Sequence, residues 1–258
     1  MLGVEDRFPA PERFADACDR LHALAAAQIG SRDFGAGDYL PGMSPLATIL
    51  FDLDGTLIDS VDLILASYRH TLEVHGREPI PDSEWLAGVG TPLRVQLQRA
   101  ARSPEDLLTL VETYREYNLA NHDTMIRPFP GVAELVLDLR AAGYRTGVVT
   151  SKNRYGTLRG LRLVGLVEAI EVLVCADDVQ HPKPHPEPVE RAVAALGADP
   201  ARTLYVGDSI HDLHSGRGAG VRTGAVLWGP FGRAELEPAA PDYWFERPDQ
   251  LRNLLLAK

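Results

Sequence analysis

Two aspartates follow an apolar segment near residue 50. The segment covers residues 48–51, and Asp52 and Asp54 come directly after it, ahead of Gly55 and Thr56. An apolar, β-favouring run that ends abruptly in polar residues and a glycine is typical of a buried parallel strand. The carboxyl ends of such strands form the edge at which open α/β sheets bind ligands. Carboxylates at that edge can ligate a metal ion or act in covalent and acid–base catalysis.

Polar residues also follow later predicted strands. Thr150 ends one β-favouring run, and Asp208 follows another. Lys183 lies between two prolines, which favour an extended loop ahead of a predicted helix. Its compact ammonium can offset the negative charge of a nearby carboxylate. His181 and His185 flank this lysine, and we expect them to be ordinary surface residues of the loop.

Taken in order, these groups resemble the four motifs of the haloacid dehalogenase superfamily. The resemblance rests on the D-x-D-G-T sequence at 52–56, the strand end at 147–152, the K-P-x-P sequence at 183–186 and the G-D-S-x-x-D sequence at 207–212. It covers residues 49–212. It implies an α/β fold with a doubly wound, mainly parallel, Rossmann-like sheet, and it implies phosphatase activity. The dehalogenases of the superfamily lack an aspartate at the position of Asp54, so dehalogenation is disfavoured.

The resemblance also implies a role for each residue. Asp52 would be the nucleophile that forms an aspartyl-phosphate, and Asp54 would be the acid and base. Mg²⁺ would be held by the side chains of Asp52 and Asp208 and by the main-chain oxygen of Asp54. Thr150 and Lys183 would bind the transferring phosphoryl group. The supporting residues are Gly55, Thr56, Ser151, Ser209 and Asp212.

Two interpretations of Asp212 remain open at this point. It could orient Lys183 or a metal-bound water, or it could simply be a favourable acidic residue in the first turn of a helix.

The rest of the chain divides into three predicted parts. Residues 1–45 form an N-terminal extension, with an amphipathic helix at 14–29 that either packs on the core or serves dimerisation or regulation. Residues 61–125 read as helices throughout, with predicted helices at 61–72, 85–101 and 103–117. A helical insertion after the first strand resembles the C1-type cap of the superfamily. Residues 46–60 and 126–258 then form the core domain.

Strand and helix patterns alternate in the second part of the core, which predicts a parallel sheet covered by helices. The predicted helices are 132–139, 155–163, 187–196, 210–219 and 249–256, and the predicted strands are 144–150, 171–175, 203–206, 224–227 and 243–245.

The charge, the cysteine content and the apolar stretches of the chain limit the kinds of partner that it can bind. The 258 residues carry a formal net charge of −10, which disfavours a nucleic-acid partner, and we expect a small phosphorylated metabolite instead. Cys18 and Cys175 are too far apart in sequence and too few to suggest a disulfide framework. No apolar stretch approaches the roughly 18–20 residues needed to span a bilayer. We expect a cytoplasmic protein, monomeric or homodimeric, with no membrane partner.

The predicted cap is the part of the chain that we expect to determine the substrate. Residues 88–93, 207–209 and 226–229 look similar to phosphoglycolate phosphatase and its pyrophosphatase relatives, and Arg94 is a possible substrate contact. A phosphoglycolate-like ester is the leading expectation, with inorganic pyrophosphate as an alternative. A phosphotransferase of the β-phosphoglucomutase type is a further alternative, although that branch typically has Glu-Asp where this chain has Gly207-Asp208. A binding or regulatory protein that retains the fold would commonly have lost an aspartate.

Overall fold

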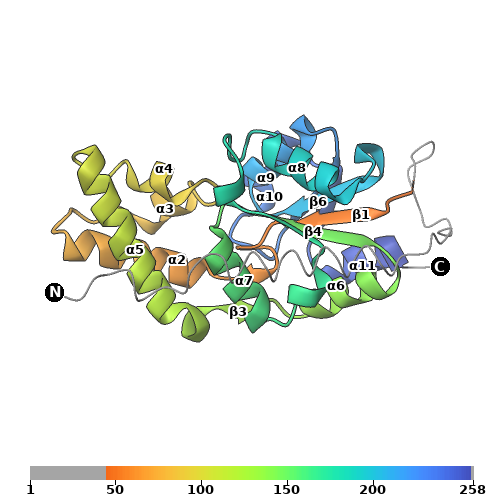
Figure 1. Cartoon of the computed structure of the whole chain (residues 1–258), viewed down its shortest axis with the longest axis horizontal. Helices are drawn as coiled ribbons and strands as arrows, with labels where there is room; N and C mark the ends of the chain where they lie inside the picture. The colour runs from red at the N-terminus through yellow and green to blue at the C-terminus, as the bar shows by residue number, and fades with distance from the viewer. Residues whose placement is uncertain (1–44, 257–258) are drawn as a thin grey trace. The chain divides into compact units, whose positions relative to one another are not determined.

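A six-stranded parallel sheet lies at the centre of the fold (Figure 1). The computed structural model describes residues 45–256, so the predicted N-terminal extension and its helix at 14–29 lie outside the described residues. Every strand pairs in parallel with its neighbours, in the order β5-β4-β1-β6-β7-β8. The predicted fold class is confirmed. The strands are β1 (Thr48–Phe51), β4 (Arg145–Val149), β5 (Val172–Val174), β6 (Thr203–Gly207), β7 (Arg222–Val226) and β8 (Tyr243–Phe245).

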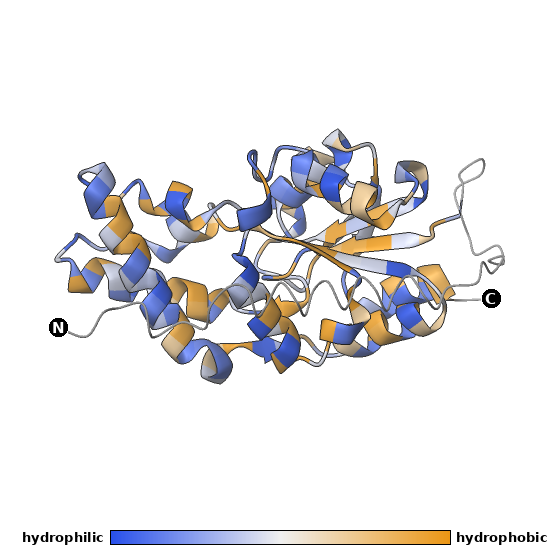
Figure 2. Cartoon of the chain, in the orientation of Figure 1, coloured by the Kyte–Doolittle hydropathy of each residue, from blue (hydrophilic) through white to orange (hydrophobic). Residues whose placement is uncertain are grey.

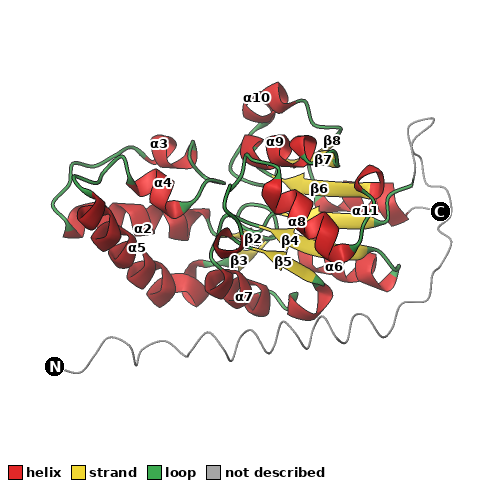
Figure 3. Ribbon diagram, turned by 45° about the horizontal axis from the view of Figure 1, so that its top comes forward, coloured by secondary structure: helices red, strands yellow, loops and turns green. Residues whose placement is uncertain are grey.

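Helices cover both faces of this sheet, as Figure 3 shows. Successive residues of a strand point to opposite faces, so Ile49 and Phe51 join one apolar cluster and Leu50 joins another. Because both faces are buried, the strands read as nearly continuous apolar runs, coloured orange in Figure 2. The covering helices are α6 (Val132–Ala141), α7 (Arg154–Leu163), α8 (Glu187–Leu196), α9 (Ile210–Gly218), α10 (Arg233–Leu236) and α11 (Pro248–Leu256).

Four helices follow the first strand and bury an apolar cluster of their own. At its centre the rings of Tyr68 and Trp85 stack with centroids 4.1 Å apart. Ser103 caps the longest helix, since its hydroxyl accepts a hydrogen bond from the Asp106 amide at 3.2 Å. The division of the chain into core and cap domains stays a prediction. The four helices are α2 (Val61–Val74), α3 (Asp82–Leu86), α4 (Leu93–Leu97) and α5 (Pro104–Met125).

A short antiparallel ribbon joins the two ends of this helical insertion. It pairs β2 (Ile58–Asp59) with β3 (Arg127–Pro128) and was not expected from the sequence, because two-residue strands carry no periodic signal. Four 3₁₀ turns complete the described fold: η2 (Val167–Ala169), η3 (Ala176–Asp178), η4 (Pro200–Arg202) and η5 (Glu237–Ala239).

Three local features were not expected from the sequence. The helix predicted at 85–101 is two short helices, α3 and α4, because Gly90 adopts a φ of +94° and Pro92 follows it. Ser60 occupies the position before α2, but its side chain makes no capping hydrogen bond. The short helix α10 was not predicted. Over residues 45–256, the structure contains no helix with the length and apolar character required to cross a bilayer.

Candidate active site

Neighbouring strands bring the predicted site residues to one edge of the sheet. Asp52 follows β1, which lies between β4 and β6, and those strands end just before Thr150 and just before Asp208. Phe51 is in register with both Val148 and Val206, so the three strand ends are level. Asp52, Thr150 and Asp208 therefore lie at one edge of the sheet, where the sequence places them.

Lys183 lies at the centre of this group and is buried. Its Nζ donates to Asp52 Oδ1 at 2.7 Å and to Asp212 Oδ1 at 2.5 Å, and it lies 3.3 Å from the Tyr205 hydroxyl. The other oxygen of Asp212 accepts hydrogen bonds from the amide and hydroxyl of Ser209, which caps α9. Asp212 thus contacts Lys183 and also stabilises a helix N-terminus, so the two interpretations of this residue are compatible.

Burial and mutual charge shift the pKa values of these groups. Burial raises the pKa of Asp52 to about 7; the Lys183 charge opposes the rise and the Asp212 charge adds to it. Burial works against the charged form of Lys183, but Asp212 and Asp52 outweigh it and raise its pKa. Burial, with the charges of Asp212 and Asp52, raises the pKa of Asp208 well above its ordinary value. These shifts favour the neutral carboxyl groups, and a cation beside Asp52 and Asp208 would favour their ionised forms instead.

The carboxylates fit a hard divalent cation. Oxygens of Asp52, Asp208 and Asp212 lie within 4.8 Å of one another. Asp208 Oδ1 accepts a hydrogen bond from Thr56 Oγ1 at 2.9 Å, whereas its buried Oδ2 has no hydrogen-bond partner among the described residues. A buried carboxylate oxygen without a partner is costly unless a cation binds it. This donor set of oxygens is the kind that Mg²⁺ prefers.

Two glycines allow this close packing around Asp208. Gly55 has a φ of +89°, and a Cβ there would lie 2.5 Å from Asp208 Oδ2. A Cβ at Gly229 would lie 2.6 Å from the Asp208 Cβ. Both positions exclude larger residues, so the backbone itself forms the wall beside the carboxylate.

Asp54 has two partners that the sequence did not reveal. The Ser60 hydroxyl donates to Asp54 Oδ1 at 2.6 Å, and Lys152 Nζ lies 2.7 Å from the same oxygen. Ser60 therefore binds the predicted acid and base in place of capping α2. Lys152 lies two residues beyond Thr150, within the recognised motif, and a basic residue just past a strand end was the signal that could have identified it.

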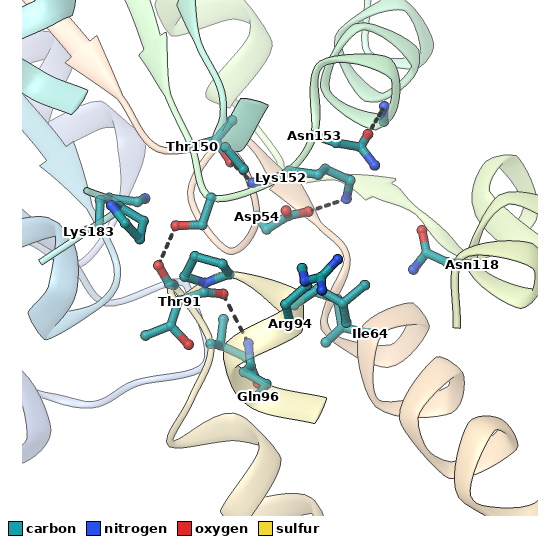
Figure 4. A pocket seen from close by; sticks show the side chains of 18 of the residues that line it. Asp54, Ile64, Thr91, Arg94, Gln96, Asn118, Thr150, Lys152, Asn153 and Lys183 are labelled. Atoms are coloured by element: carbon teal, nitrogen blue, oxygen red, sulfur yellow. Dashed lines mark hydrogen bonds and ion pairs between the residues drawn. The ribbon is translucent and has the colours of Figure 1, made fainter. Parts of the chain in front are cut away.

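A cavity of about 290 Å³ opens above these residues, between them and α4 and α5. Asp54 and Lys152 line it from the sheet side, and Arg94 and Asn118 from the helical side, as Figure 4 shows. Arg115 also lines it and, like Asn118 and Lys152, was not predicted.

The two hydroxyl residues after β4 make local hydrogen bonds. The Ser151 hydroxyl donates to the Gly90 carbonyl at 2.6 Å and so joins the loop between α3 and α4 to the sheet edge. Thr150 lines the cavity and accepts a hydrogen bond from the Lys152 amide at 3.1 Å.

Comparison with known proteins agrees with this geometry. A family model described as haloacid dehalogenase-like hydrolase matches residues 49–226. The chain belongs to this family. The predicted enzyme class, a phosphatase of the haloacid dehalogenase superfamily, is thereby confirmed.

The haloacid dehalogenase-like relatives include two bacterial proteins named pyrophosphatase PpaX. The protein from Anoxybacillus flavithermus is 41% identical over 208 residues, which are 81% of this chain and 96% of that protein. The protein from Bacillus cereus is 40% identical over 209 residues, again 81% of this chain and 95% of the relative. Among solved structures, a haloacid dehalogenase-like hydrolase from Bacteroides fragilis has a TM-score of 0.75 at 27% identity, covering 80% of this chain and 99% of that one.

Proposed function

We propose that this chain is a Mg²⁺-dependent phosphohydrolase that cleaves inorganic pyrophosphate through an aspartyl-phosphate on Asp52. The observation that carries the proposal is the number of cations around the cavity. Asp52 and its partner Lys183 line it, and Lys152, Arg94 and Arg115 add three further cations to the lining. A substrate with a phosphoryl group to transfer and a second anionic group to leave would match these charges.

Asp52 and Lys183 have different roles in the proposed reaction. Lys183 holds one oxygen of Asp52, which leaves the second oxygen to attack phosphorus and form the acyl phosphate. Lys183 also offsets the negative charge that gathers as the phosphoryl group approaches a carboxylate. When bound by Asp52, Asp208 and the main-chain oxygen of Asp54, Mg²⁺ would supply further positive charge there.

Asp54 would move the protons. It would donate a proton to the oxygen of the leaving phosphate, and then accept one from the water that hydrolyses the acyl phosphate. Ser60 and Lys152 fix one oxygen of Asp54, so its other oxygen can face the substrate. The Thr150 hydroxyl, which lines the cavity, would donate to a phosphoryl oxygen.

The names of the relatives support pyrophosphate as the leading substrate, which reverses the order of preference obtained from the sequence. Phosphoglycolate is the second candidate, because Arg94 and Arg115 could pair with its carboxylate as well as with a leaving phosphate. The cap helices would then select the substrate through the anionic group that they contact.

Phosphate release tests the proposal. Wild type and Asp52→Asn are assayed with pyrophosphate, phosphoglycolate and p-nitrophenyl phosphate, each with and without Mg²⁺. We expect the highest kcat/KM for pyrophosphate, loss of activity without Mg²⁺, and a decrease of at least about 1,000-fold in Asp52→Asn. Equal activity of the two proteins would refute the mechanism. A higher kcat/KM for phosphoglycolate would refute the substrate alone, and transfer of phosphate to a hexose phosphate would favour a phosphotransferase.

A further inference from the structure

Two histidines and a glutamate gather on the outer side of the loop that carries Lys183. His181 and His185 are exposed, and their rings lie with centroids 4.7 Å apart. Glu187 begins α8, and its Oε2 lies 2.9 Å from His181 Nδ1. One nitrogen of each histidine and one oxygen of Glu187 lie within 4.8 Å of one another. This cluster is separate from the catalytic carboxylates, since Lys183 points inward to Asp52 while the histidines are on the surface.

We propose that His181, His185 and Glu187 form a second metal site, which binds Zn²⁺ or a similar transition-metal ion. Two imidazoles and one carboxylate are a recurrent zinc donor set, in which water takes the fourth position. Ligand atoms about 2.0–2.1 Å from zinc lie roughly 3.3 Å apart in a tetrahedron. His181 Nδ1 and Glu187 Oε2 are 2.9 Å apart, somewhat closer than that spacing, so small rotations of these side chains and of the exposed His185 would bring the three ligands to it.

The donor types distinguish the two sites. Mg²⁺ binds oxygen ligands and keeps several waters, so it would favour the carboxylates of Asp52 and Asp208. Imidazole nitrogen favours zinc, nickel and copper ions. The two ions would thus occupy different places on the same protein.

Backbone amides already hold two of the three ligands in place. The Glu187 amide donates to His185 Nδ1 at 3.1 Å. Glu187 Oε1 accepts a hydrogen bond from the Gln180 amide at 3.0 Å, and Oε2 accepts one from the His181 amide at 2.8 Å. Arg191 also donates to Oε1 at 2.9 Å. A bound ion would replace the contact between His181 Nδ1 and Glu187, and the nitrogen that binds the ion would carry no proton.

A bound ion would affect the loop that carries Lys183, because the two histidines lie on either side of this lysine. His181 lies two residues before Lys183 and His185 two residues after it. An ion bound by both would connect the two sides of the loop and restrict its motion, and with it that of the catalytic lysine. The inference concerns metal binding alone and does not depend on which phosphate compound is the substrate.

Calorimetric titration of untagged protein with Zn²⁺, in a large excess of Mg²⁺, tests the site. The proteins are wild type, the double variant His181→Asn/His185→Asn and the control His214→Asn, which changes another exposed histidine. We expect wild type and the control to bind one Zn²⁺ ion at this site. The affinity for this ion should fall at least about tenfold in the double variant. His22 and Cys18, whose side chains can also bind Zn²⁺, are unchanged in all three proteins. Equal Zn²⁺ affinity in wild type and the double variant, or no binding to wild type, would overturn the proposal.

Thermal unfolding provides a second measurement on the same proteins. Zn²⁺ should raise the Tm of wild type and of the control by about 2–6 °C, because it binds the folded chain preferentially. The double variant should unfold cooperatively near the wild-type Tm without Zn²⁺ and show no rise with it. A rise of the same size in the double variant would place the ion elsewhere and overturn the proposal.

Discussion

Lys152 Nζ lies 2.7 Å from Asp54 Oδ1, and the two residues come from loops that follow neighbouring strands. This pair connects the proposed acid and base to the part of the cavity that would hold the leaving group. Lys152 is only partly exposed, so its charge acts in a setting less screened than the open surface.

Replacement of Lys152 by methionine should therefore lower activity in a manner that depends on the leaving group. We expect kcat/KM to fall about 100-fold for pyrophosphate, whose leaving phosphate carries several negative charges. The decrease should be about tenfold or less for p-nitrophenyl phosphate, because its leaving group carries a single delocalised charge. Lys152→Arg, which keeps the charge, is the matched control. Equal losses on the two substrates would contradict a role at the leaving group.

Thr56 should control the affinity for Mg²⁺. Its hydroxyl donates to Asp208 Oδ1 and so orients the carboxylate whose other oxygen has no partner among residues 45–256. Thr56→Val removes this hydrogen bond at nearly constant volume, and the Mg²⁺ concentration for half-maximal activity should rise about tenfold. Thr56→Ser keeps the hydroxyl and should behave like wild type. An unchanged Mg²⁺ requirement in the valine variant would show that Asp208 needs no such orientation.

Asp212 should contribute to stability and to catalysis through Lys183. The Asp212→Asn variant leaves Lys183 with only one carboxylate partner in a buried site, and the free energy of unfolding should fall by about 3 kcal/mol. We also expect kcat to fall at least about tenfold. Urea unfolding and steady-state kinetics measure the two effects. Ser209→Ala is the control, because it removes a helix cap at a cost of about 1 kcal/mol and should largely spare kcat.

His122 should make stability depend on pH. Its side chain is fully buried, and burial lowers its pKa, although the contact with Asp123 opposes the shift and the charges of Lys152 and Arg159 add to it. The unfolded histidine has a pKa of about 6.5. Between the folded pKa and about 6.5, the unfolded chain binds a proton that the folded chain does not. The contribution of His122 to the free energy of unfolding is therefore complete above about pH 6.5 and declines as the pH falls toward the folded pKa.

The measurement is urea unfolding of wild type and His122→Gln at a series of pH values from about 7.5 to about 5. The variant should lose less stability than wild type over this interval. His214→Gln, at an exposed position, should retain the wild-type profile. Parallel profiles for wild type and His122→Gln would show that His122 is not the group responsible.

The sequence by itself determined the sheet and the residues at its edge. Apolar runs such as 48–51 are long enough to identify buried strands, and the residue that follows each run must emerge at the carboxyl end. For that reason the sequence alone predicts that Asp52, Thr150 and Asp208 lie close together. The α8 and β8 bounds also match their predictions, because Pro188 and a short β-favouring run mark them locally.

Tertiary structure decided the contacts between segments that are distant in sequence. The pairings of Lys152 with Asp54 and of Ser151 with Gly90 depend on how loops from different elements meet, which no local periodicity encodes. Likewise, Arg115 and Asn118 belong to a helix whose pattern shows only that it is amphipathic, and packing alone turns them toward the cavity. The sequence therefore determines the residues at the sheet edge, because strand ends are local features. The fold decides which residues line the rest of the cavity, because that part is assembled from separate loops and helices.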